Sequence, residues 1–200
     1  MNQIAPAKFY TKIYEQVILD YHLTEKNKNP YFLNSIEYQI YQKNWIDTIQ
    51  WHLEDLTRDS KITGIQMISL KQEIDSSNQE RNNIVEIIDD LMFDILYQDL
   101  IFDEGLPLNS ETPGWILDRL SILELKIFHM SEQVDRVGVL NEHVIRCKNK
   151  LQILKSQKCD LLLSFDTLIN EILTSKRRYK VYKQMKMYND PTLNPILYKK

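Results

Sequence analysis

The chain has 200 residues, 43% of them hydrophobic and 26% charged, and a formal net charge of −3. This length and composition are typical of one globular domain with a buried core. No apolar run approaches the ~20 residues that cross a bilayer, and the opening residues MNQIAPAKFYTKIYEQ lack the pattern of a signal peptide. Cys147 and Cys159 have no CxxC partner and are interpreted as reduced thiols. We therefore expect a cytoplasmic protein.

The charges are divided unevenly along the chain. Residues 1–112 contain 9 Lys/Arg and 19 Asp/Glu, whereas residues 113–200 contain 16 Lys/Arg and 9 Asp/Glu. The acidic first half argues against nucleic-acid binding there. We expect the two halves to attract each other.

Helical periodicity dominates the sequence, and only four glycines and six prolines interrupt it. We predict an all-α, single-domain bundle of about six helices. In chain order, the helices are expected at about 7–22, 31–58, 65–99 and 113–132, over a heptad-patterned stretch from 137 to 172, and at about 176–188.

Two helix starts carry sequence signatures. Thr112 and Pro113 fit an N-cap followed by proline at the first helical position. Ser77 and Glu80 fit the S-x-x-E capping box, which allows the third helix to restart at Ser77.

The stretch from Val137 to Ile172 carries apolar residues at heptad spacing and predicts one long helix or a helical hairpin. We favour a seam inside the bundle, and a coiled-coil homodimer stays open. Residues 1–175 would then form the bundle, and residues 176–200 a basic helix with a tail. The basic and tyrosine side chains of that helix are interpreted as a solvated face that pairs with the acidic half. Binding of phosphates or anionic lipid is the alternative.

Polar side chains gather in three helical segments. In the first, NWIDTIQWHLEDLTRD, the residues Trp51, Asp55 and Arg58 lie opposite the apolar side, and His52 lies between the two faces. A large aromatic ring on a polar face needs a neighbour. This segment therefore indicates a contact or a site on its polar face.

The second segment, SNQERNNIVEIIDD, places Arg81 inside an apolar stripe. Asn78, Asn82, Glu86 and Asp89 lie on or beside that stripe. A buried guanidinium is unfavourable unless a carboxylate or a phosphate pairs with it. Either partners are close by, or this face lines a wet cavity.

The third segment, ETPGWILDRLSILELKIFHM, is apolar nearly all round, which is typical of a buried helix. Asp118, Lys126 and His129 share one flank of it. Their partners are expected from the first two segments.

The motifs WHLED, SNQERN and TPGWILDRLSIL resemble signatures of a family of uncharacterised helical bacterial proteins found mainly in the Bacteroidota. The likeness runs over residues 36–130. It implies a helical fold and an association with genes for cell-surface glycan assembly. It supplies no activity and no site residue.

We expect the three segments to form a polar site between helices that binds a phosphorylated or nucleotide-sugar ligand. Its ligand-binding residues would be Trp51, Arg58, Asn78, Arg81, Asn82, Asp118, Arg119 and Lys126.

Metal-dependent hydrolysis is the enzyme hypothesis. His52-x-x-Asp55 and Glu86-x-x-Asp89 each place two candidate ligands on one helix face, where a divalent cation such as Mg²⁺ or Mn²⁺ would bind. This pattern resembles that of helical nucleotide pyrophosphohydrolases, with His52 in place of a glutamate. Without a metal, His52 with Asp55, or His129 with a partner from elsewhere, would serve as a general base.

The alternative is a non-catalytic adaptor or scaffold in which the same residues form a buried ion-pair network. A network matches each of Asp55, Glu86 and Asp118 directly with a cation and leaves no cavity; the candidate cations are Arg58, Arg81, Arg119 and Lys126. A site instead has a water-accessible pocket with unpaired carboxylates or His on one side and Arg or Lys on the other.

Overall fold

The computed structural model describes residues 4–101, 103–185 and 192–193. Within these ranges the chain forms five α-helices and no β-strand, which confirms the all-α prediction. None of the described helices is long and apolar enough to cross a membrane. The helices are α1 (Ala7–Thr24), α2 (Ile36–Leu56), α3 (Gly64–Tyr97), α4 (Pro113–Val134) and α5 (Asn141–Leu173).

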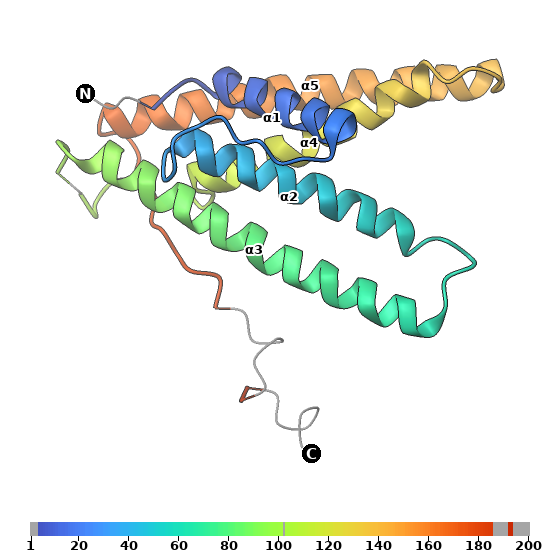
Figure 1. Ribbon diagram of the computed structural model, residues 1–200. Helices are drawn as coiled ribbons and strands as arrows, with labels where there is room; N and C mark the ends of the chain where they lie inside the picture. The colour runs from blue at the N-terminus through green and yellow to red at the C-terminus, as the bar shows by residue number, and fades with distance from the viewer. Residues whose placement is uncertain (1–3, 102, 186–191, 194–200) are drawn as a thin grey trace.

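The helices are arranged as two antiparallel hairpins, α2–α3 and α4–α5, with α1 packed against both (Figure 1). Helix α1 contacts α2, α4 and α5, and α4 contacts each of the other four helices. The two hairpins diverge toward the loops that join their helices (Figure 1). Helix α4 is therefore the element on which residues from several helices converge.

One core receives buried side chains from every helix. The hydroxyl of Tyr14 is fully buried and donates a hydrogen bond to the backbone carbonyl of Leu117 at 3.0 Å. A fully buried apolar side chain stabilises the fold by about 1.5–3 kcal/mol. Prominent core members are Tyr10 and Val17 of α1, Ile40 and Tyr41 of α2, Ile88 and Met92 of α3, Leu117 and Leu120 of α4, and Phe165 and Ile172 of α5.

Helix α3 is continuous, so the predicted restart at Ser77 is wrong. The Ser77 hydroxyl donates to the Gln50 side chain of α2 at 3.4 Å and does not cap α3. The capping box that starts the helix is formed by Thr63 and Gln66. The S-x-x-E pattern gave the wrong start because Ser77 bonds to a neighbouring helix.

Helix α5 is a single helix and not a hairpin. Near its C-terminal end the heptad positions Phe165, Leu168 and Ile172 are buried. Val137 and Leu140, at the other end of the pattern, precede the helix and are 92% and 79% exposed. The α4–α5 hairpin projects beyond α1 at that end (Figure 1), so the heptad pattern marks a packed seam over only part of its length. A homodimer through α5 stays a prediction.

The predicted basic helix at 176–188 is wrong over its described part, because residues 174–185 contain no α-helix. We call residues 177–185 the strap. The N–H of Arg178 donates to the carbonyl of Pro107 at 3.0 Å, and its carbonyl accepts from the N–H of Asn109 at 2.7 Å. Pairing with the loop before α4 therefore replaces the hydrogen bonds that a helix would make.

The strap continues across the bundle after this pairing. Tyr179 is fully buried and packs against Phe93 of α3, with ring centroids 5.6 Å apart. The strap then follows α3 (Figure 1), where Lys183 pairs with Asp90 at 2.6 Å. The rest of the predicted basic tail, 186–191 and 194–200, lies outside the described residues.

The acidic and basic halves of the chain pair with each other, as expected. Besides the pair of Lys183 with Asp90, Lys158 of α5 pairs with Glu15 of α1 at 2.9 Å. Lys180 pairs with Glu104 at 3.2 Å. Most of these groups are partly exposed, so each pair contributes about 0–1 kcal/mol. The charge asymmetry therefore directs basic segments toward acidic ones more than it stabilises the fold.

The start of α4 is joined to α3 through Asp89. As predicted, Thr112 caps the helix and Pro113 is at its first position. The buried Asp89 carboxylate accepts hydrogen bonds from the Thr112 hydroxyl at 2.5 Å and from the Gly114 N–H at 2.7 Å. A carboxylate at a helix N-terminus is stabilised by the free N–H groups and the helix dipole. A Cβ at Gly114 would lie 2.6 Å from Asp89 Oδ1, so only glycine fits this contact.

We expect Gly114→Ala to lower the free energy of unfolding by about 1–3 kcal/mol, because the methyl group displaces Asp89 and leaves a buried N–H without its acceptor. Urea denaturation measures the change. Gly64→Ala is the matched control, since a Cβ at Gly64 meets nothing within 4 Å. Alanine there should be neutral or add up to about 1 kcal/mol. Equal losses in both variants would contradict the role of Asp89.

Candidate functional site

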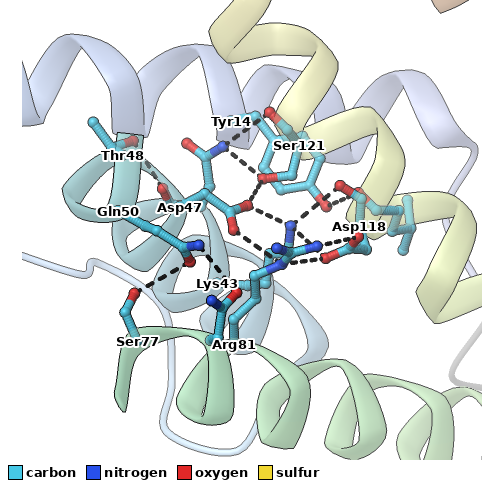
Figure 2. Close-up of polar contacts among 12 residues, drawn as sticks. Tyr14, Lys43, Asp47, Thr48, Gln50, Ser77, Arg81, Asp118 and Ser121 are labelled. Atoms are coloured by element: carbon cyan, nitrogen blue, oxygen red, sulfur yellow. Dashed lines mark hydrogen bonds and ion pairs between the residues drawn. The ribbon is translucent and has the colours of Figure 1, made fainter. Parts of the chain in front are cut away.

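Four charged side chains from three helices meet in the interior, where α2, α3 and α4 converge. Both oxygens of Asp118 accept hydrogen bonds from Arg81, from Nε and from Nη2, each at 2.9 Å (Figure 2). Lys43 Nζ lies 2.9 Å from Asp118 Oδ1 and also pairs with Asp47. Arg81 Nε lies 3.5 Å from Asp47 Oδ1. We call these four residues the charge network.

Neutral side chains add hydrogen bonds around the charge network, although Asp47 Oδ1 and Asn44 Oδ1 have no hydrogen-bond partner among the described residues. The Ser121 hydroxyl of α4 donates to Asp47 (Figure 2). The Asn44 amide of α2 donates to the Ser121 oxygen at 2.7 Å. Asn44 and Ser121 are fully buried. Buried polar groups of this kind specify how two helices align, because any shift leaves several of them without partners.

Two carboxylates and two cations balance each other in the charge network. Burial raises the pKa of Asp47, although Lys43 and Arg81 oppose that effect. Burial acts on Asp118 in the same direction, but Lys43 and the bidentate Arg81 hold the pKa of Asp118 below its usual value. Asp118 is therefore the ionised anchor, and its hydrogen bonds raise the pKa of Arg81 despite the burial of the guanidinium.

The sequence interpretation named Arg81 and Asp118 but missed Lys43 and Asp47. A lysine and an aspartate four residues apart are typical of an exposed helical pair, yet here both are at most 2% exposed. The available signal was their position on the same side of α2 as core residues such as Ile40.

An open cavity of about 590 Å³ lies beside the charge network, bordered by α3, α4 and α5. We call it the basic groove. Arg119 in its wall pairs with the partly exposed Glu111 at 3.1 Å. Among the described residues, Lys126 has no hydrogen-bond or ion-pair partner. The groove is lined by Arg81, Asp118, Arg119, Ile122, Leu123, Lys126, Gln157, Asp160, Leu161 and Ser164.

Two further cavities adjoin the basic groove through shared residues. One, of about 230 Å³, shares Arg81 and Ile122 with the groove and also contains Trp51, Asp55 and Arg58. The other, of about 480 Å³, is mainly apolar and shares Lys126 and Gln157 with the groove. Trp51 lines both, and its ring stacks on His129 with centroids 4.9 Å apart. The neighbour that Trp51 required is thus a histidine.

The structure places the predicted ligand-binding residues in two groups. Asn78 accepts a hydrogen bond from Gln50 at 3.0 Å, and Asn82 is buried within α3, so neither lines the cavities described above. The other six residues line the basic groove or its neighbours: Trp51, Arg58, Arg81, Asp118, Arg119 and Lys126.

The predicted metal ligands are not brought together. Asp89 caps α4, while Glu86 accepts a hydrogen bond from the Gln184 N–H of the strap at 2.8 Å. Asp55 pairs with the exposed Arg58 at 2.8 Å. The i, i+3 spacing placed each pair on one helix face, but tertiary contacts direct the four side chains to different partners.

Histidine side chains converge instead. Among the described residues, His22, His52 and His129 are the group of three candidate metal ligands whose ligand atoms lie within 4.8 Å of one another. They come from α1, α2 and α4. The partner of His129 that the sequence left open is Glu132, whose Oε2 lies 2.7 Å from His129 Nδ1. His22 was missed, because a single histidine at the end of a helix carries no signal of its own.

The environment of His52 favours its uncharged form. Burial, together with the neighbouring His22 and His129, lowers the pKa of His52. A neutral imidazole keeps one nitrogen lone pair free. The ring also stacks on Tyr21, with centroids 5.3 Å apart.

Comparison with known proteins places the chain in a family without assigning it an activity. The model of a family described as "Protein of unknown function (DUF4254)" matches residues 37–181, which include all three sequence motifs. No curated protein and no solved structure matches the chain. The function is therefore argued from the geometry of the site.

We expect Asp118→Asn to lower the free energy of unfolding by about 3–5 kcal/mol, because Lys43 and Arg81 are then left with a single buried carboxylate between them. Denaturant unfolding measures the loss. Asp55→Asn removes the acid of the exposed pair with Arg58 and should change stability by about 1 kcal/mol or less. A loss for Asp118→Asn as small as that of the control would show that the charge network does not fix the three helices.

Asp89 gives a pH dependence with a defined sign. Burial raises the pKa of Asp89 from 3.8 to about 6, so the folded protein holds this proton more tightly than the unfolded chain. The resulting stabilisation is present below about pH 4 and is lost as the pH rises through about 6. Between pH 4 and 7, wild type should lose about 2 kcal/mol relative to Asp89→Asn. Urea unfolding of both proteins at several pH values measures this, and parallel curves would refute it.

Proposed function

We propose that this chain, which belongs to the DUF4254 family, binds a phosphorylated small molecule in the basic groove. The observation that carries the proposal is the clustering of Arg81, Arg119 and Lys126 around one open cavity of about 590 Å³. Ligand pockets typically occupy about 300–1,000 Å³. Guanidinium and ammonium groups on one wall are the donors that phosphate oxygens require.

The three cations differ in their availability to a ligand. Arg81 is held by Asp118, so it is a positioned donor that is not free to move. Arg119 pairs with Glu111 at the surface, and such pairs contribute only about 0–1 kcal/mol, so a phosphate displaces the carboxylate readily. Lys126 is exposed and has no partner among the described residues. A phosphate therefore meets one fixed and two adjustable cations.

The remaining walls suit the rest of such a ligand. Gln157, Asp160 and Ser164 of α5 line the groove and offer hydrogen bonds to hydroxyl groups, such as those of a sugar. The adjoining apolar cavity contains Trp51, on which an aromatic base would stack. These features favour a nucleotide or nucleotide sugar within the class of phosphorylated ligands.

The proposal does not extend to hydrolysis by the predicted metal ligands. The carboxylates of Asp89 and Glu86 are engaged by α4 and by the strap. A hydrolase of the predicted type requires these carboxylates to face a shared cation.

The charge network supports a second candidate function, that of a non-catalytic helical adaptor. Asp118 is directly matched by Arg81 and Lys43, as a purely structural network requires. The two candidates differ in what they expect of the groove. An adaptor has no affinity for phosphorylated molecules there, whereas the proposed site does.

Isothermal titration calorimetry with inorganic pyrophosphate and uridine diphosphate tests the proposal. We expect saturable binding of both, and tighter binding of uridine diphosphate if the base contacts Trp51. Lys126→Gln and Arg119→Gln should each raise Kd about tenfold, since a charge-assisted hydrogen bond contributes about 1.5 kcal/mol.

Two matched controls separate groove binding from general attraction to basic side chains. Arg146 on α5 is exposed and pairs with Glu142, as Arg119 pairs with Glu111, but it does not line the groove. Lys148 is likewise exposed on α5 and does not line the groove. Arg146→Gln and Lys148→Gln should therefore leave Kd unchanged. Absence of saturable binding, or equal weakening in test and control variants, would reject the groove and leave the adaptor as the surviving candidate.

A further inference from the structure

Three of the four histidines in the chain meet at one point between α1, α2 and α4, away from the charge network. One candidate ligand atom from each ring lies within 4.8 Å of the others. His22 Nε2 and His52 Nε2 are 3.3 Å apart. His22 is exposed, while His52 and His129 are half-buried, so the cluster is reached from solvent on the side of α1.

Two of the rings have their other nitrogen fixed by an acceptor. His22 Nδ1 lies 2.7 Å from the carbonyl of Ile18, and His129 Nδ1 lies 2.7 Å from the carboxylate of Glu132. An acceptor at Nδ1 keeps the proton there and leaves the Nε2 lone pair free. This is the outer-shell arrangement that orients histidines toward a metal.

Within the described part of the chain, His129 Nε2 is buried and has no hydrogen-bond partner. With Nδ1 donating to Glu132, Nε2 is a lone-pair acceptor without a donor. Buried polar atoms are satisfied in the large majority of cases, so this atom requires an explanation. A metal ion supplies one.

The spacing of His22 and His52 agrees with tetrahedral zinc, and a ligand atom of His129 lies within 4.8 Å of theirs. Zinc–nitrogen bonds of about 2.0–2.1 Å at tetrahedral angles put two ligand nitrogens about 3.3 Å apart. The separation of His22 Nε2 and His52 Nε2 has this value. Three imidazoles suit Zn²⁺ and not the hard cations Mg²⁺ and Ca²⁺, which prefer oxygen ligands.

We propose that His22, His52 and His129 bind one Zn²⁺ ion, with a fourth coordination position left for water. The ion joins the end of α1 to α2 and α4. The lining of the basic groove contains none of the three histidines, and only His129 also lines the adjoining apolar cavity that contains Trp51.

Aromatic packing without a metal ion explains less of the histidine arrangement than a bound ion does. Tyr21 stacks on His52, and Phe128 packs against His22 with centroids 4.7 Å apart, so aromatic contacts do hold the rings. A hydrogen bond from His52 Nε2 to His22 Nε2 accounts for the 3.3 Å separation in the absence of metal. Neither contact provides a partner for His129 Nε2, which the metal does.

Titration of the chelator-treated full chain with Zn²⁺ by calorimetry tests the site. We expect one ion per chain, and a visible absorption spectrum typical of tetrahedral geometry when Co²⁺ is used as the probe. His22→Gln, His52→Gln and His129→Gln should each raise the Kd for Zn²⁺ at least tenfold. Mg²⁺ should give no saturable binding.

His143→Gln is the matched control, because His143 is the remaining histidine and lies on α5, outside the cluster. It should leave the affinity for Zn²⁺ unchanged. Glu132→Gln changes a half-exposed side chain and keeps the test valid if a histidine variant does not fold. It should weaken Zn²⁺ binding about tenfold or more.

No saturable Zn²⁺ binding, or binding that is weakened equally in His143→Gln and in the cluster variants, would overturn the proposal. So would full retention of affinity in Glu132→Gln together with an octahedral Co²⁺ spectrum. Pyrophosphate binding to His22→Gln should match wild type, so failure of the zinc site and failure of the basic groove are read out separately.

Discussion

The bidentate ion pair between Arg81 and Asp118 is the contact on which the rest of the structure depends. It ties α3 to α4, and Lys43 extends the same carboxylate to α2. Because Lys43 and Asp118 are buried and Arg81 is mostly covered, sliding or rotation of a helix would leave a charge unpaired. The pair also forms part of the wall of the basic groove. The charge network that fixes the helices therefore also forms part of the wall of the groove and holds that wall rigid.

How far the sequence predicts this site depends on whether a residue breaks a local rule. Arg81 does: a guanidinium in an apolar stripe requires a buried carboxylate, and Asp118 on an otherwise apolar helix requires a cation. Arg81 therefore predicts a carboxylate as its partner, and Asp118 predicts a cation as its partner. Lys43 and Asp47 break no local rule, since the same pair is ordinary on an exposed helix. Their burial follows from the packing of α4 against α2, which no short stretch of sequence encodes.

The predicted metal ligands show what the spacing of residues along one helix cannot predict. Spacing along one helix fixes which side chains share a face but not what lies opposite them. Glu86 and Asp89 share a face, yet one meets the strap and the other the start of α4. His22 and His52 are 30 residues apart in sequence and come within 3.3 Å only because α1 packs against α2 in this register. The approximate positions of the five observed helices were thus predictable, whereas the restart at Ser77, the basic helix and the convergence between helices depended on tertiary contacts.

The strap has a consequence for the order in which the fold is completed. Tyr179 enters the core and Arg178 pairs with the loop before α4, so a segment synthesised after all five helices closes a contact with residues some seventy positions earlier. Contacts between such distant segments form late, because the intervening chain must first be ordered. Until the strap is in place, the part of α3 around Phe93 and the loop before α4 are not covered by Tyr179 and Arg178. The strap is therefore expected to close last, and its detachment would expose the apolar surface that Tyr179 covers.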